Sequence, residues 1–219
     1  MAGGYYAVKV GRGGPAVFTT WTACEDAVKG YKGAKYKSFK SLSEAGDYLN
    51  EKEPATIQQV TDPLESNADA LIVYTDGSSL SNGRIGARAG AGVYFGTNDR
   101  RNQSVRIPAH ERQSNQRAEL LAVLLALRVA GEEHRMLEVR TDSKWVISGM
   151  TEWCHRWKMN GWQTSTGDLV LHQDLWMAII DLVEGRQGGV FWRHVKGHSN
   201  EPGNDAADLL ARSAALSDF

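Results

Sequence analysis

The stretch Leu71-Ile-Val-Tyr-Thr-Asp-Gly77 begins the larger part of this 219-residue chain and decides its fold. Its first five residues are apolar, aromatic or β-branched, which is typical of a buried strand, and Asp76 follows them. The stretch Leu137-Glu-Val-Arg-Thr-Asp142 repeats this pattern later in the chain. Each stretch therefore predicts a strand with a carboxylate at its polar end.

Two further acidic positions lie where helices are predicted to begin. Gln113-Ser-Asn-Gln-Arg-Ala-Glu119 opens one helix, and Gly203-Asn-Asp-Ala-Ala-Asp208 opens another. Clustered carboxylates repel one another unless a cation neutralises them. Acids from four elements therefore predict a divalent-metal site, to which the last helix offers either Asp205 or Asp208.

The order of the predicted elements from residue 71 onward indicates the fold class. Two antiparallel strands follow the first one, and strands and helices alternate after them. Strands that alternate with helices after an initial meander indicate a mixed sheet covered by helices, in the α/β class. The later strands are expected at 89–96, 103–107, 137–142 and 190–195. One helix is expected after Asn115, its cap, with apolar spacing through Leu127, and the others are expected at 143–150, 172–184 and 203–215.

Residues 5–49 predict a small separate domain in the order strand, strand, helix, strand, helix, with Thr22 as the cap of its first helix. Residues 1–50 carry seven Lys and Arg residues against four acids, which favours a polyanionic partner. Residues 51–70 are acidic and contain Pro54 and Pro63 as breakers, which predicts a flexible linker.

Composition limits the class of protein further. Apolar residues make up 42% of the chain and charged residues 23%, which is ordinary for a soluble globular protein. No window approaches the run of about 18 apolar residues that a membrane span requires, and the first residues lack the features of a signal peptide. We expect an intracellular monomer without a membrane partner, in the nucleus or the cytoplasm, with the mitochondrion left open. Cys24 and Cys154 fall in different predicted domains, so no framework disulfide is expected.

Taken together, the motifs Tyr74-Thr-Asp-Gly77, Asn115-Gln-Arg-Ala-Glu119, Thr141-Asp-Ser143 and Gly197-His-Ser199 resemble type 1 ribonuclease H. Residues 5–49 resemble the hybrid-binding domain that precedes the nuclease in eukaryotic members. The resemblance implies a ribonuclease H-like mixed five-stranded sheet flanked by helices, preceded by a small α/β hybrid-binding domain. The implied domains are residues 1–50, the linker 51–70 and the catalytic domain 71–219.

The resemblance also implies the chemistry, which is endonucleolytic hydrolysis of the RNA strand of RNA–DNA hybrids to 3′-hydroxyl and 5′-phosphate ends. Two Mg²⁺ ions, with Mn²⁺ as an alternative, would bind the carboxylates, and two such cations about 4 Å apart can activate water and stabilise the leaving oxygen. The family motif sets the last ligand at Asp208 rather than Asp205, and it assigns His198 to water activation and product departure. The implied ligands are Asp76, Glu119, Asp142 and Asp208.

Contacts to both nucleic acid strands follow from the same resemblance. The helical spacing of Trp153 and Trp157 is equally typical of a core stripe, so their role stays open. Side chains that match positions reading the RNA 2′-hydroxyl groups are Asn82, Asn115 and Gln116. Those that match contacts to the DNA strand are Arg112, Ser114, Trp145, Trp153 and Trp157, and those of the N-terminal domain are Trp21 and Tyr36 as stacking surfaces and Lys37 as a phosphate contact.

Two positions depart from the family pattern. Ser38 stands where many relatives have a second lysine, and His172 stands where they place the Asn of the phosphate pocket. A non-catalytic binder of hybrids or of double-stranded RNA is the main alternative function, although it would gain nothing from four acids that face a polyanion. A different nuclease or integrase on this fold would lack the N-terminal domain and the Asn115–Gln116 pair.

Overall fold

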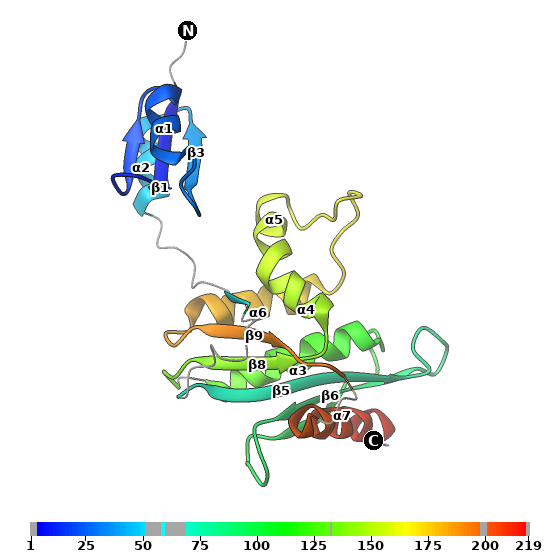
Figure 1. Ribbon diagram of the computed structural model, residues 1–219. Coiled ribbons are helices and arrows are strands. Elements are labelled where there is room, and N and C mark those ends of the chain that lie inside the picture. Colours follow the sequence, from blue (N-terminus) through cyan, green and yellow to red (C-terminus); the bar gives the residue numbers. More distant parts are fainter. Residues whose placement is uncertain (1–3, 51–57, 60–68, 132, 198–200, 218–219) are drawn as a thin grey trace. The chain divides into compact units, whose positions relative to one another are not determined.

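The computed structural model describes residues 4–50, 58–59, 69–131, 133–197 and 201–217 (Figure 1). The chain divides into two compact units, Met1–Glu53 and Pro54–Phe219, and each is treated by itself below.

The first unit is a three-stranded antiparallel sheet with two helices. Its strands lie in the order β2-β1-β3, and Val8 of β1 packs with Cys24 of α1 in a small core. The Oγ1 atom of Thr20 accepts from the amide of Ala23, so Thr20 caps α1 and the prediction of Thr22 was wrong. The elements are β1 (Tyr5–Val10), β2 (Ala16–Phe18), α1 (Trp21–Val28), β3 (Lys35–Phe39) and α2 (Leu42–Asn50).

The second unit contains a six-stranded mixed sheet in the order β4-β9-β8-β5-β6-β7. The five predicted strands are present, and β5 runs parallel to β8 but antiparallel to β6. The sixth strand, β4, comes from the predicted linker, since Gln58 and Gln59 pair with β9. The bounds are β4 (Gln58–Gln59), β5 (Leu71–Leu80), β6 (Arg88–Tyr94), β7 (Gln103–Arg106), β8 (Leu137–Thr141) and β9 (Val190–His194).

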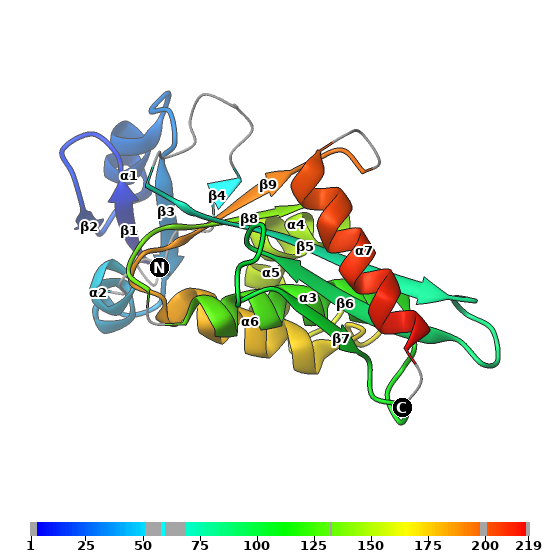
Figure 2. The ribbon, with the colours of Figure 1, turned by 90° about the horizontal axis from the view of Figure 1, so that it is seen from below.

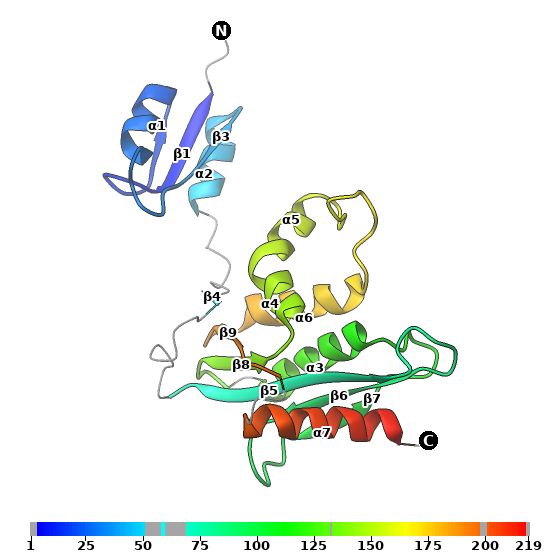
Figure 3. The same ribbon diagram turned by 45° about the vertical axis from the view of Figure 1, so that its right-hand side comes forward.

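Helices cover both faces of this sheet. Helix α7 lies on one face, over β5, β6 and β7, whereas α3, α4 and α6 lie on the other (Figures 2 and 3). A Cβ atom at Gly90 or Gly92 would collide with the backbone of α7, so small residues on β6 permit the close approach of that helix. The helices are α3 (Asn115–Ala130), α4 (Lys144–Ser148), the π-helix η2 (Gly149–Trp153), α5 (Cys154–Met159), α6 (Gln173–Gly185) and α7 (Pro202–Leu216).

Two local predictions for this unit were wrong. The cap of α3 is Ser114, whose Oγ atom accepts from the amide of Arg117, and Asn115 is the first residue of the helix. The strand expected to end at Asp76 continues to Leu80, because residues 77–80 pair with β6. Asp76 therefore lies within β5, buried in the sheet rather than at its end.

Candidate active site

Strand β5 and helix α3 bring the first two acids together. Asp76 is buried on β5, and Glu119 is buried in the second turn of α3. A Cβ atom at Gly77 would collide with the backbone of Glu119, so the strand and the helix are in contact at this point. Glycine at residue 77 therefore allows two carboxylates from different elements to share one cavity.

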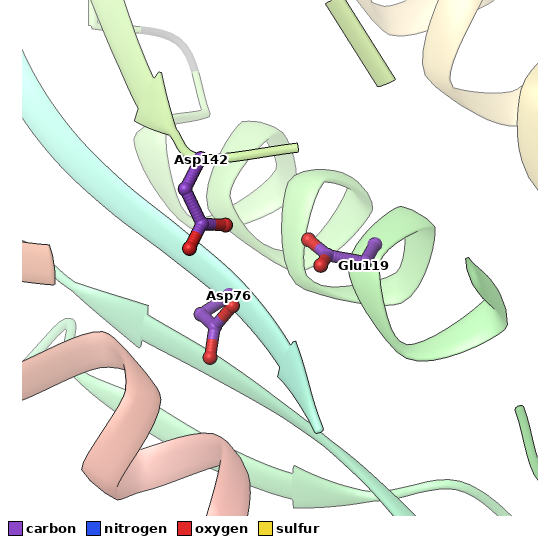
Figure 4. A group of neighbouring side chains, drawn as sticks. All are labelled: Asp76, Glu119 and Asp142. Atoms are coloured by element: carbon purple, nitrogen blue, oxygen red, sulfur yellow. The ribbon is translucent and has the colours of Figure 1, made fainter. Parts of the chain in front are cut away.

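The third acid follows the neighbouring strand. Strands β5 and β8 are parallel, and Tyr74 pairs with Arg140. Asp76, two residues after Tyr74, and Asp142, two residues after Arg140, therefore lie at corresponding positions along the two neighbouring segments. One carboxylate oxygen from each of Asp76, Glu119 and Asp142 lies within 4.8 Å of the others. Figure 4 shows the three side chains pointing toward one another from β5, α3 and the end of β8.

Helix α7 adds the fourth predicted acid. Asp208 lines the same cavity, of about 380 Å³, together with Asp76, Glu119 and Asp142. Asp205 is exposed in the first turn of α7 and does not line this cavity. The structure thus brings Asp208 to the other three carboxylates, whereas Asp205 faces solvent.

The electrostatics of this cavity favour a cation. Burial, followed by the charges of Asp142 and Asp208, raises the pKa of Asp76 to about 7. Burial and the charges of Asp76 and Asp142 also raise the pKa of Glu119 well above its usual value. A divalent cation would remove this repulsion, and the Oδ1 atom of Asn204, buried and without a hydrogen-bond partner in the described chain, adds an oxygen donor. The donor set therefore fits a hard cation such as Mg²⁺.

Comparisons with known proteins agree with this geometry. The family model described as RNase H matches residues 68–216, more than half of the chain. The chain belongs to the ribonuclease H family. A second family model, described as the ribonuclease H1 N-terminal domain, matches residues 4–49.

Individual ribonuclease H relatives are similar over nearly the whole chain. Ribonuclease H1 of Mus musculus is 34% identical over 260 residues, covering 97% of this chain and 90% of the mouse protein. Ribonuclease H of Schizosaccharomyces pombe is 35% identical over 262 residues, covering 96% of this chain and 97% of the yeast protein. The solved structure of LC9-RNase H1, described as a type 1 RNase H with the type 2 active-site motif, is 31% identical with a TM-score of 0.51, covering 68% of this chain and 74% of that one. The predicted family is confirmed, and the protein is a ribonuclease H enzyme.

The predicted RNA-reading residues of this ribonuclease H surround the first turn of α3. Asn82 Oδ1 accepts from the amide of Asn115 at 3.3 Å, and Asn115 Nδ2 donates to Glu119 Oε1 at 3.4 Å. Asn115 lines the acidic cavity, and its neighbour Gln116 lines a second cavity of about 720 Å³. That second cavity is also lined by Asn82, Arg112 and Ser114.

The predicted DNA-side tryptophans lie at a third cavity, of about 570 Å³. Trp145 and Trp153 are half-buried there, and the ring centroids of Trp145 and Trp176 lie 5.0 Å apart in an edge-to-face arrangement. Trp157 is only 8% exposed and packs between Trp162 and Trp176. Trp157 is therefore part of the core and also lines this cavity, so its contact to the DNA strand stays a prediction.

His172 occupies a constrained position before α6. Its backbone is left-handed, with φ of 59°, and its Nδ1 atom lies 3.4 Å from Nη1 of Arg117. Burial, then the charges of Arg117 and Arg112, lower the pKa of His172. The charge of Arg112 thus affects the pKa of His172, but His172 does not line the cavity that Arg112 and Ser114 line.

Arg117 is a residue to which the sequence assigned no role. Its guanidinium donates two hydrogen bonds to Asp174, at 3.1 and 2.7 Å, and one to Glu111 at 2.5 Å. These bonds join the start of α3 to the start of α6. The partners Arg117 and Asp174 are 57 positions apart, so no local pattern could have paired them.

The N-terminal unit of the enzyme presents a cluster of aromatic rings. The ring of Trp21 lies 5.6 Å from Tyr6 and 5.8 Å from Tyr36, and Trp21 and Tyr36 are 44% and 46% exposed. Lys37 is exposed on the same strand as Tyr36, with its Nζ atom 5.5 Å from the ring of Phe39. Trp21 and Tyr36 therefore share one open ring cluster, whereas Lys37, the next residue on β3, projects from the opposite face of the strand. His198, the remaining predicted catalytic residue, lies outside the described residues.

Proposed function

We propose that this ribonuclease H is an endonuclease that hydrolyses the RNA strand of RNA–DNA hybrids. The observation that carries the proposal is the meeting of Asp76, Glu119 and Asp142 within 4.8 Å, with Asp208 in the same cavity. Unneutralised carboxylates repel a polyanion, so a surface evolved only for binding would gain nothing from this arrangement. The cavity thus favours catalysis over the alternative of a non-catalytic hybrid or double-stranded-RNA binder.

We infer that the four carboxylates hold two Mg²⁺ ions, with Mn²⁺ as an alternative. When bound, such ions supply activation of water and stabilisation of the leaving oxygen, which yields 3′-hydroxyl and 5′-phosphate ends. The protein itself supplies the placement of the donors. Asp76 and Asp142 come from adjacent parallel strands, and Glu119 comes from α3, the helix in contact with Gly77. Asp208 comes from α7, which covers the face of the sheet opposite to α3.

The RNA strand would be recognised beside this cavity. Asn115 lines it, and Asn82 and Gln116 lie around the same helical turn. Amide side chains both donate and accept, so they can contact 2′-hydroxyl groups that DNA lacks. Placing these amides next to the carboxylates would direct cleavage to the RNA strand.

The DNA strand and the rest of the hybrid would be held by surfaces away from the carboxylates. Arg112 and Ser114 offer donors to a phosphate, and Trp145 and Trp153 offer ring surface at the third cavity. In the N-terminal unit, Trp21 and Tyr36 would stack and Lys37 would contact phosphate. We therefore assign hybrid binding to the N-terminal unit and cleavage to the second unit.

The cellular setting rests on composition. We propose an intracellular monomer, in the nucleus or the cytoplasm, with the mitochondrion left open. Across the residues that the structure describes, no helix combines the length and apolar character needed to cross a bilayer.

A cleavage assay with four substrates tests the function. A labelled RNA–DNA hybrid, the matched DNA duplex, the matched RNA duplex and single-stranded RNA are incubated with the enzyme and Mg²⁺. We expect cleavage of the RNA in the hybrid alone, with 3′-hydroxyl ends. Asp76→Asn and Asp142→Asn should abolish cleavage while hybrid binding survives, because each removes a metal-binding charge and also reduces repulsion of phosphate. Binding without cleavage by the wild-type protein would establish the non-catalytic alternative.

A further inference from the structure

A chain of polar side chains connects the sheet to the start of α7. The hydroxyl of Tyr74 donates to Glu201 Oε1 at 2.6 Å, and Nη1 of Arg140 donates to the Tyr74 hydroxyl at 2.7 Å. Arg140 Nη1 also lies 3.7 Å from Glu201 Oε1. Three residues from β5, β8 and the N-cap of α7 thus form one linked group.

The other end of this chain is anchored in the sheet. Glu138 is 2% exposed, and its Oε1 atom accepts from Nε of Arg140 at 2.8 Å and from Nε of Arg193 at 2.6 Å. Two arginines and the two acids Glu138 and Glu201 balance in charge. Because buried charges are tolerated only when they are paired with good geometry, this balance restricts where Arg140 can point.

The first turn of α7 is held against Tyr74 by more than one contact. A Cβ atom at Gly203 would collide with the ring of Tyr74, so the ring and the helix backbone touch. The carbonyl of Glu201 accepts from the amide of Asp205 at 3.0 Å, which closes the first helical turn. The side chain of Glu201 and the backbone at Gly203 therefore tie the helix start to the strand.

The same two strands place two of the predicted metal ligands. Tyr74 and Asp76 are two residues apart on β5 and project from one face, the face that α7 covers. Arg140 likewise lies two residues before Asp142. Contacts that fix the start of α7 to Tyr74 therefore also fix the separation of Asp208 from Asp76.

We propose that Tyr74, Arg140 and Glu201 are positioning residues that set the depth of α7, and with it Asp208, against the other three carboxylates. The inference rests on the proposed function, since it assigns these residues to the same site. None of the three needs to touch substrate. A misplacement of about 1 Å at a reacting centre can cost about 100-fold in rate, so a hydrogen bond one or two helical turns away can affect catalysis.

The decisive comparison is Tyr74→Phe against Tyr94→Phe. Both variants remove one hydroxyl and keep the ring, and Tyr94 pairs with Tyr74 across the strands while its hydroxyl contacts Thr97 at 3.2 Å. We expect Tyr74→Phe to lower kcat by about tenfold or more with the KM for hybrid unchanged, because the effect falls on the geometry of the ligands. We expect Tyr94→Phe to behave as the wild type.

Two readouts are independent of turnover. Calorimetric titration with Mg²⁺ in the absence of hybrid should show weaker binding for Tyr74→Phe than for Tyr94→Phe. Hydrogen exchange should become faster at the amides of the first turn of α7 in Tyr74→Phe, and exchange in α3 should not change. A purely structural role for Tyr74 would lower the unfolding temperature without these local effects.

Substitution of Glu201 provides a rescue test. Glu201→Gln keeps an oxygen that accepts from the Tyr74 hydroxyl, so it should retain most of the activity, whereas Glu201→Ala should match Tyr74→Phe. If Tyr74→Phe and Tyr94→Phe are alike in kcat, Mg²⁺ binding and exchange, the positioning role is refuted. If the wild type fails to cleave hybrids, the proposed function fails, and the Mg²⁺ and exchange readouts still decide whether Tyr74 holds α7.

Discussion

Gly77 and Glu119 touch backbone to backbone, since a Cβ atom at residue 77 would collide with the amide nitrogen of Glu119. This contact joins β5 to α3 at the wall of the acidic cavity, which both residues line. It explains how a strand acid and a helix acid reach the same space, because no side chain separates the two backbones. The geometry of the acidic cavity therefore depends on the absence of a Cβ atom at residue 77.

Gly77→Ala should therefore damage both stability and catalysis. The added methyl group meets backbone, which cannot rotate away, and overpacking of this kind typically costs about 1–3 kcal/mol of unfolding free energy. Displacing Glu119 should also lower kcat by about 100-fold. Urea denaturation and hybrid cleavage measure the two effects. Gly185→Ala, at a glycine of α6 with open space around it, is the control and should cost nothing in either assay.

Asp208 and Asp205 form a matched pair on α7. Asp208→Ala should reduce hybrid cleavage by about 100-fold or more, because it removes a carboxylate from a site where bound metal contributes several kcal/mol. Asp205→Ala should stay close to wild type, since Asp205 is exposed outside the acidic cavity. Steady-state cleavage at saturating Mg²⁺ distinguishes them. The opposite ranking would show that the last ligand lies one helical turn away from its assigned place.

The aromatic cluster of the N-terminal unit should control affinity rather than chemistry. Trp21→Ala should weaken hybrid binding by about 1–3 kcal/mol, the range for loss of one base-stacking ring. Tyr31→Ala is the matched control, because Tyr31 is 40% exposed but lies outside the cluster of Tyr6, Trp21 and Tyr36.

Deletion of residues 1–50 extends this test to the whole unit. Cleavage by the remaining chain should persist, while hybrid affinity falls and its salt dependence becomes shallower, since phosphate contacts are lost. Affinity measured at several salt concentrations checks this. An unchanged affinity and salt slope would remove hybrid binding from the functions of this unit.

His172 should make stability depend on pH. Its pKa in the folded protein is below the ordinary value of 6.5, because of burial and the charges of Arg117 and Arg112, which outweigh Asp174. Above pH 6.5 both folded and unfolded forms are neutral at this residue. Below it the unfolded chain binds the proton first, so stability is lost until the pH falls through the folded pKa. The wild type should therefore lose stability on acidification relative to His172→Asn, in which Asn tolerates the left-handed backbone.

The pH dependence of hybrid affinity tests the role of His172 separately from the pH dependence of stability. A phosphate held beside the imidazole would favour its protonated form, so wild-type affinity should tighten as the pH falls toward the lowered pKa of the imidazole in the free protein. His172→Asn should lack that component, and comparison of the two proteins cancels the titration of the shared carboxylates. Parallel pH curves for the two would place His172 outside the phosphate site.

The sequence by itself predicted five strands of the second unit and three of the acids, Asp76, Glu119 and Asp142, but it left Asp205 and Asp208 as alternatives in the last helix. Apolar runs before Asp76 and Asp142, and apolar spacing after Glu119, are local patterns that report which residues are buried. Errors fell at boundaries, where several side chains can compete for one role. The hydrogen bond from a free amide in the first turn of α1 is accepted by Thr20 rather than Thr22. In α3 it is accepted by Ser114 rather than Asn115, and which side-chain oxygen caps a helix depends on the path of the chain that enters it.

Only the tertiary structure decided which of these residues meet. The continuation of β5 to Leu80 depends on pairing with β6, and the burial of Trp157 depends on rings from other segments. The link from Tyr74 to Glu201 spans 127 positions. Periodicity reports which face of an element is buried, but it carries no information on the partner that buries it. Contacts between distant segments are set by the packing of the whole sheet and its helices, because each depends on the positions of all the others.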